Sequence, residues 1–147
     1  MSLAEEVDAL KRIPLFANIE TSKLKLLAFT SERLTFRAGD VLFSQNDMGD
    51  AAYIIMSGEA DVIVGVDGGE RVVATLGKND FVGEIAILCD VPRTATVKAK
   101  SDLTTLMITK DLFFRLITEF PQMAVEIMRE LALRLEKTTK QAVLRAR

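Results

Sequence analysis

The stretch from Phe81 to Val97 reads FVGEIAILCDVPRTATV and interrupts a series of short β-rich segments. Gly83 allows a backbone conformation, or a close approach, that a Cβ atom would forbid. The segment after it, Glu84 to Leu88, is predicted to form one or two helical turns, whose free N–H groups suit an anion. Arg93 adds a permanent cation matched to a phosphate, and Glu84 adds a carboxylate that accepts hydrogen bonds from sugar hydroxyls. These residue types together predict a nucleotide ligand.

Two motifs in this stretch, GEIA at 83–86 and PRTATV at 92–97, resemble the phosphate-binding cassette of cyclic nucleotide-binding domains. That family includes the regulatory subunits of cyclic-nucleotide-dependent kinases, cyclic-nucleotide-gated channels and the bacterial catabolite activator protein. Upstream, FRAGD at 36–40, VLFSQ at 41–45 and GDAAYIIMSG at 49–58 resemble the family's strand-turn-strand pattern. Asn46 stands where the family usually has a glycine, and asparagine tolerates positive φ better than other side chains. The resemblance covers roughly residues 13 to 135.

The resemblance implies a role for each polar residue of the cassette, which we define as residues 81–97. The Glu84 carboxylate is expected to accept a hydrogen bond from the ribose 2′-hydroxyl, with the Gly83 backbone nearby. Arg93 is expected to neutralise the exocyclic oxygen of the cyclic phosphate, helped by backbone N–H groups of the cassette helix, Thr94 and Ala95. In the family a threonine at the position of Thr94 admits cGMP without requiring it. We therefore expect cAMP as the ligand, with cGMP as a possible ligand.

The expected apolar contacts to the ligand are less specific than the polar ones. Ile85 and Ala86 belong to the matching motif. Val73, Ala74 and Ile85 are candidate wall residues, although ordinary core packing explains each of them at least as well. In the family the last helix can close over the base, which makes Leu131 and Leu135 candidates for a base cap. Glu84 and Arg93 have an alternative explanation that involves no ligand. Both would then lie on the surface and pair with each other.

The composition predicts one domain over residues 1–147 and limits the chemistry available to it. With 49% hydrophobic and 27% charged residues, the chain has the composition of a soluble globular protein. A net charge of −2 argues against bulk attraction to nucleic acid or to an anionic membrane, and no apolar run is long enough to span a bilayer. The single cysteine, Cys89, cannot form an internal disulfide, so a cytoplasmic location is expected.

The absence of histidine excludes most routes to an enzyme. Without histidine and with one cysteine, a monomer cannot build an ordinary zinc site, a histidine-ligated haem, or a Ser-His-Asp or Cys-His arrangement. A cupin-like barrel enzyme is disfavoured for the same reason. No general base is evident beside the expected phosphate site, so we expect binding without hydrolysis, with no metal and no cofactor other than the ligand.

The residue pattern predicts a mainly β fold, a jelly-roll β-barrel with flanking helices. An N-terminal helical segment is expected over 1–30, with helices at 3–12 and 22–28, the second capped by Thr21 or Ser22. The barrel is expected over 31–109, with a tight hairpin turn at 67–70. Its strands are expected at 33–36, 41–44, 52–57, 59–66, 71–76, 96–99 and 104–109. Two C-terminal helices are expected over 110–147, the second beginning at Pro121.

The last helix carries a candidate heptad seam, which would allow a homodimer. The seam residues are Ala124, Met128, Leu131, Leu135, Thr138 and Ala142, and ordinary packing on the barrel is the alternative. No helix-turn-helix follows the helix before the sequence ends. The basic residues near the end, Lys137, Lys140, Arg145 and Arg147, are too few to read a DNA groove, so DNA binding by this chain alone is disfavoured.

The sequence thus predicts a ligand-responsive regulatory module that binds a cyclic nucleoside monophosphate without catalysis. The alternative is a ligand-free scaffold of the same fold that acts through helix-mediated assembly. The regulated partner is not predicted by any motif in the chain.

Overall fold

A computed structural model describes residues 2–145, except for the side chains of Ile85, Ala86 and Arg134. Arg147 of the basic tail lies outside the described residues. The helices are α1 (Leu3–Lys11), the 3-10 turn η1 (Pro14–Phe16), α2 (Thr21–Thr30), α3 (Glu84–Leu88), α4 (Lys110–Glu119) and α5 (Pro121–Arg145). The strands are β1 (Glu32–Phe36), β2 (Val41–Phe43), β3 (Ala51–Ser57), β4 (Ala60–Val66), β5 (Gly69–Leu76), β6 (Phe81–Val82), β7 (Thr96–Ala99) and β8 (Leu103–Thr109).

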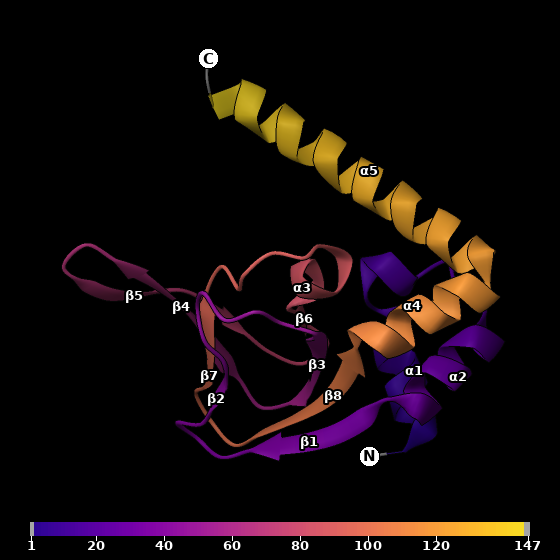
Figure 1. Ribbon diagram of the computed structural model, residues 1–147, viewed down its shortest axis with the longest axis horizontal. Helices are drawn as coiled ribbons and strands as arrows, with labels where there is room; N and C mark the ends of the chain where they lie inside the picture. Colours follow the sequence, from indigo (N-terminus) through magenta and orange to yellow (C-terminus); the bar gives the residue numbers. More distant parts are fainter. Residues whose placement is uncertain (1, 146–147) are drawn as a thin grey trace.

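The strands form two four-stranded antiparallel sheets, in the orders β1-β8-β3-β6 and β2-β7-β4-β5. Neighbouring strands are mostly distant in sequence, as in a jelly roll, so the predicted fold class is confirmed. The two sheets stand side by side on the left of Figure 1, and α1, α2 and α4 gather on the right. Strand β6 was missing from the prediction, because two residues are too few to show an alternating pattern.

Two clusters of buried side chains hold these layers together. A smaller cluster lies between the sheets and includes Ile55, Val97 and Leu103. A larger one joins the helices to the outer face of the first sheet and includes Phe16, Leu27 and further residues of α1, α4 and α5. Six of the seven residues of β3 are buried, because this strand has the second sheet on one face and helices on the other.

The β4–β5 hairpin forms as the sequence predicts. Val66 pairs with Gly69 across the turn residues Asp67 and Gly68, and Gly68 has φ of 92°, which a side chain would oppose. The hairpin projects away from the rest of the barrel in Figure 1. Its register shifts opposite Val62 and Ile63, where Val73 is the additional residue of β5.

The predicted helices are all present, but the predicted cap of α2 is wrong. That helix is preceded by Glu20, with no side-chain capping bond, and Thr21 already belongs to its first turn. By contrast, the Thr109 hydroxyl accepts a hydrogen bond from Leu112 N at 3.2 Å and caps α4. Pro121 begins α5, where a missing N–H is tolerated.

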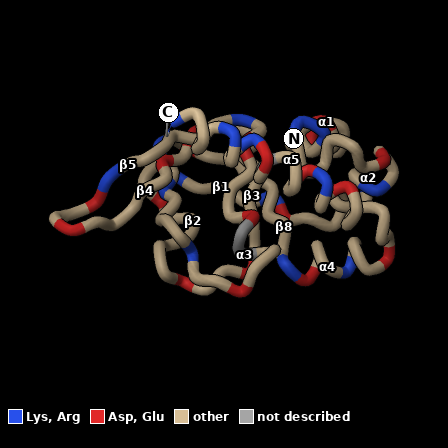
Figure 2. Tube along the Cα trace, turned by 90° about the horizontal axis from the view of Figure 1, so that it is seen from above, with Lys and Arg blue, Asp and Glu red and all other residues tan. Residues whose placement is uncertain are grey.

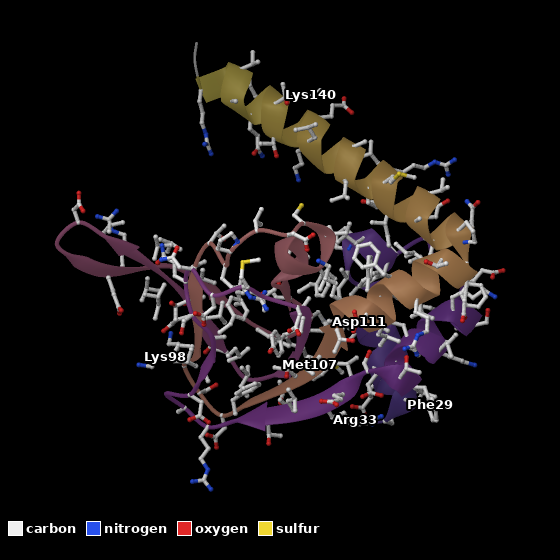
Figure 3. All side chains as sticks on the ribbon, in the orientation of Figure 1. Phe29, Arg33, Lys98, Met107, Asp111 and Lys140 are labelled. Atoms are coloured by element: carbon white, nitrogen blue, oxygen red, sulfur yellow. The ribbon has the colours of Figure 1, made fainter. Side chains whose placement is uncertain are left out.

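An ion pair between a half-exposed arginine and a buried carboxylate connects α1 to the barrel. Arg33 Nη2 of β1 lies 2.6 Å from Glu6 Oε1, and the Glu6 side chain has no exposed surface. Figure 3 places Arg33 on the part of β1 nearest the helices. The second carboxylate oxygen of Glu6 has no hydrogen-bond partner among the described residues. The buried Glu6 charge therefore depends on its ion pair with Arg33.

Helix α5 leaves the helical layer and runs diagonally above the barrel (Figure 1). Its first two turns pack into the larger core through Met123 and Ile127, whereas Met128 and Leu135 are 60% and 67% exposed. Lys140 lies on the distal half that stands apart from the strands (Figure 3). No helix within residues 2–145 combines the length and the hydrophobicity that crossing a membrane requires. Acidic and basic residues alternate along the chain trace without separating into two faces (Figure 2).

Candidate functional site

A cavity of about 180 Å³ opens beside the cassette, at the junction of the two sheets. Five of the predicted site residues line it, which are Gly83, Glu84, Arg93, Thr94 and Ala95. The remaining walls come from Phe43, Val62, Val82, Pro92 and Val97, none of which was predicted as a site residue. The cassette therefore brings only five of the predicted site residues to one cavity, where residues of four different strands complete the wall.

The structure does not bring every predicted contact to this cavity. Val73 lies on the hairpin with 53% of its surface exposed and is absent from the cavity wall. Leu131 packs against the helical core and Leu135 is exposed on α5, so neither lines the cavity. The side chains of Ile85 and Ala86 lie outside the described residues, although both belong to α3.

Gly83 connects β6 to α3 with a backbone that only glycine adopts easily. Its φ is 89°, and a Cβ atom there would lie 2.6 Å from Arg93 Nη1 and 3.3 Å from the Ala51 carbonyl oxygen. The glycine thus permits the chain reversal and also leaves room for the arginine. Glu84 follows as the first residue of α3, at the edge of the cavity.

Arg93 is the most unusual side chain of the site, because it is a cation with only 7% of its surface exposed. Its Nη2 donates to the Ala51 carbonyl at 2.7 Å and its Nη1 to the Gly83 carbonyl at 3.3 Å, while Nε is buried without a partner among the described residues. Burial excludes the alternative that Arg93 is a surface residue. Its two hydrogen-bond acceptors are neutral carbonyls, which leaves further N–H groups of the cation for an anion in the cavity.

The backbone of Arg93 is held by a loop that the sequence motifs also marked. Arg93 N donates to Asp47 O at 2.7 Å, and Asn46 N donates to Arg93 O at 2.8 Å. Asn46 has φ of 74°, so the prediction that it is a compatible turn residue is confirmed. The β2–β3 loop and the cassette, almost fifty residues apart in sequence, are therefore paired through their backbones.

Electrostatic surroundings adjust two ionisable groups beside the cavity. Burial lowers the pKa of the Arg93 guanidinium, and the nearby Tyr53, Asp50 and Asp47 act in the opposite direction. Burial raises the pKa of Tyr53, while the Arg93 charge opposes that change. Even a lowered arginine pKa leaves the group charged near neutral pH, so the cavity keeps its cation.

Sequence reasoning missed two residues that contact the guanidinium directly. The Phe43 ring centroid lies 3.9 Å from Arg93 Cζ, and the main chain of Gly49 packs against the same group. Both stood in quoted motifs, but only their place in the strand-turn-strand pattern was interpreted. No local signal identifies a contact between residues 43 and 93, because it depends on how the two sheets fold together.

Comparison with known proteins agrees with this geometry. A family model described as the cyclic nucleotide-binding domain matches residues 33–120. The cAMP-dependent protein kinase regulatory subunit of Blastocladiella emersonii is 36% identical over 109 residues, which are 74% of this chain and 27% of that protein. The chain spans about a quarter of the length of the curated relatives it matches.

Solved structures support the same relationship. The N-terminal domain of a transcriptional regulator from Streptomyces coelicolor superposes with a TM-score of 0.85 at 29% identity, covering 92% of this chain and 95% of that one. The regulatory domain of Toxoplasma gondii PKA, crystallised with cAMP, gives a TM-score of 0.75 at 29% identity, covering 78% and 44%. With the family match extending from β1 to the end of α4, the chain belongs to the cyclic nucleotide-binding domain family.

Proposed function

We propose that the cavity binds a cyclic nucleoside monophosphate, with cAMP favoured and cGMP allowed, and that the chain acts as a ligand-responsive regulatory module without catalysis. The observation that carries the proposal is Arg93, a buried guanidinium on the cavity wall that donates to two neutral carbonyls and whose Nε has no acceptor among the described residues. A phosphate is the anion that its planar donors match best.

The other cavity residues supply the chemistry expected for the rest of the ligand. The Glu84 carboxylate, on the cavity wall, is proposed to accept a hydrogen bond from the ribose 2′-hydroxyl, and backbone N–H groups near Thr94 and Ala95 to donate to the phosphate. Val62, Val82 and Val97 offer an apolar surface for the base of the nucleotide. The names of two similar proteins, one a cAMP-dependent kinase subunit and one crystallised with cAMP, support the preference for cAMP.

The regulatory part of the proposal rests on contacts between the cassette and the helices. Ile87 of α3 is 1% exposed and belongs to the helical core, and α3 contacts both β3 and α4. Asp90, just after α3, forms an ion pair with Lys110, the first residue of α4. A ligand that shifts the cassette would therefore also shift α4 and α5. It would regulate the chain by binding one arrangement of these helices more tightly than another.

Helix α5 is the proposed site of assembly into a homodimer. On the predicted seam Met128 and Leu135 are 60% and 67% exposed, and other positions of the helix expose Leu133, Val143 and Leu144. Sedimentation equilibrium on the parent chain and on Leu135→Glu would measure this, and an unchanged monomeric mass for both would refute it. A cytoplasmic location stays a prediction.

Calorimetric titration with cAMP and cGMP tests the ligand proposal, using chain stripped of copurified nucleotide. Arg93→Ala should weaken binding by roughly 30-fold to several thousand-fold, since removing one partner of a buried charge pair costs about 2–5 kcal/mol. Arg12→Ala, which removes an exposed arginine directly after α1, is the matched control and should bind as the parent does. Absence of binding by the parent at high micromolar nucleotide would refute the proposal and favour the ligand-free scaffold.

A further inference from the structure

The guanidinium of Arg93 is a flat group, and both of its faces are covered. The Phe43 ring covers one face, with its centroid 3.9 Å from Cζ. A Cβ atom on Gly49 would lie 2.2 Å from Nε, 2.4 Å from Cζ and 2.7 Å from Nη2, and these three distances together place it above the plane of the group. Because the ring already occupies one face, the main chain of Gly49 covers the other.

The ring that covers the guanidinium is itself fixed by other aromatic residues. The Phe43 and Tyr53 rings are stacked, with centroids 6.0 Å apart and an angle of 27° between their planes. Phe36 meets Tyr53 edge to face at 6.3 Å, and Tyr53 is only 8% exposed. Such pairs have preferred geometries, so the column Phe36–Tyr53–Phe43 fixes the plane in which Phe43 presents its face to the cation.

Covering both faces leaves only the edge of the guanidinium for a ligand. Five N–H groups radiate in its plane, and the carbonyls of Ala51 and Gly83 accept from one of them each. An anion must therefore approach in that plane, where two parallel N–H groups can meet two oxygens of one phosphate. The arrangement suits an arginine and would give a lysine, which is a point charge without a plane, no comparable orientation.

We propose that Phe43 is a positioning residue for the ligand phosphate: with the Gly49 main chain it clamps the Arg93 guanidinium so that its edge, and not its face, receives the exocyclic oxygens. This inference rests on the proposed function, because it assigns to the cavity the phosphate of a cyclic nucleotide. Phe43 acts through Arg93, so its contribution to affinity should disappear when the guanidinium is removed.

A double-mutant cycle tests this dependence, with cAMP as the probe and nucleotide-free chain as the starting material. Phe43→Leu should weaken cAMP binding by roughly 5- to 30-fold, the range expected for a desolvated cation–π contact. In the Arg93→Ala background the same change should alter affinity less than about twofold. Phe43→Tyr, which restores the ring, should return affinity to within about threefold of the parent. Phe29→Leu is the matched control, because it makes the same change at an exposed phenylalanine that does not line the cavity.

The outcomes of this cycle separate a failure of the Phe43 inference from a failure of the proposed function. Undiminished cAMP binding by folded Phe43→Leu overturns the inference and leaves the proposed function intact. A penalty that persists fully in the Arg93→Ala background means that Phe43 contacts the nucleotide itself, which also overturns it. Failure of the parent chain to bind refutes the proposed function and this inference together. Should Phe43→Leu fail to fold, Phe43→Met keeps the apolar volume, removes the ring and takes its place in the cycle.

Discussion

Gly49→Ala is the substitution that should damage the site most selectively. Gly49 does not have a positive φ, so alanine fits its backbone, and only the added Cβ changes the structure. That atom would lie 2.7 Å from Arg93 Nη2 and closer still to Nε and Cζ, whereas ordinary contact begins at 3.4 Å. The guanidinium cannot retreat directly, because the Phe43 ring lies 3.9 Å behind it.

The added Cβ atom should displace the Arg93 guanidinium by about 1 Å, since contacts of 2.7 Å or less must lengthen to about 3.4 Å. Such a displacement would lengthen the 2.7 Å hydrogen bond from Nη2 to the Ala51 carbonyl. Misplacing a binding group by about 1 Å can cost on the order of 100-fold, which corresponds to roughly 2.7 kcal/mol of binding free energy. Overpacking should cost a further 1–3 kcal/mol or so of folding stability.

Calorimetric titration with cAMP and urea denaturation of the same sample measure these two effects. Gly77→Ala is the matched control, because a Cβ atom on Gly77 meets nothing within 4 Å and the residue has no positive φ. The control should bind and unfold as the parent does. If folded Gly49→Ala binds cAMP within about threefold of the parent, the close packing of Gly49 on the guanidinium has no functional role and the reasoning is refuted.

Three further predictions concern stability. Arg33→Met should lower the free energy of unfolding by about 3 kcal/mol, because it leaves the Glu6 carboxylate buried and unpaired. Its control is Arg12→Met, which breaks an exposed ion pair and should lower that free energy by less than about 1 kcal/mol. Thr109→Ala, which removes the α4 cap, should cost about 1 kcal/mol in urea unfolding. Burial raises the pKa of Tyr53, so its stabilising contribution should be complete below pH of about 10 and lost as pH rises further. Near-ultraviolet absorbance follows this group alone, since the chain has one tyrosine and no tryptophan; a Tyr53 titration at the unfolded value would contradict the prediction.

The parts of the fold that the sequence predicts are those set by local chemistry. The Asp67–Gly68 turn follows from glycine conformation, and α4 and α5 follow from apolar periodicity and Pro121. The α2 cap was wrong because Glu20, with no side-chain hydrogen bond, precedes a helix that already includes Thr21. Capping preferences describe many helices on average and do not fix one boundary.

The site shows the same limit in its non-local contacts. The cassette motif predicted which polar residues line the cavity, because they are consecutive or nearly so in the chain. The covering of Arg93 by Phe43 and Gly49 could not be predicted, since it depends on the packing of the β2–β3 region against the cassette. Val73 was named as a wall residue without knowledge of the bulge that makes it the additional residue of β5.

The most direct test of the central claim is the side-chain ¹H–¹⁵N resonance of Arg93 Nε. This N–H is buried without a partner among the described residues, so it should exchange slowly with water and give a signal that is absent from Arg93→Lys. The account predicts that saturating cAMP moves this signal, while the Nε signals of exposed arginines such as Arg12 stay in place. A chain that binds cAMP with the Arg93 signal unchanged would contradict the claim that this guanidinium receives the phosphate.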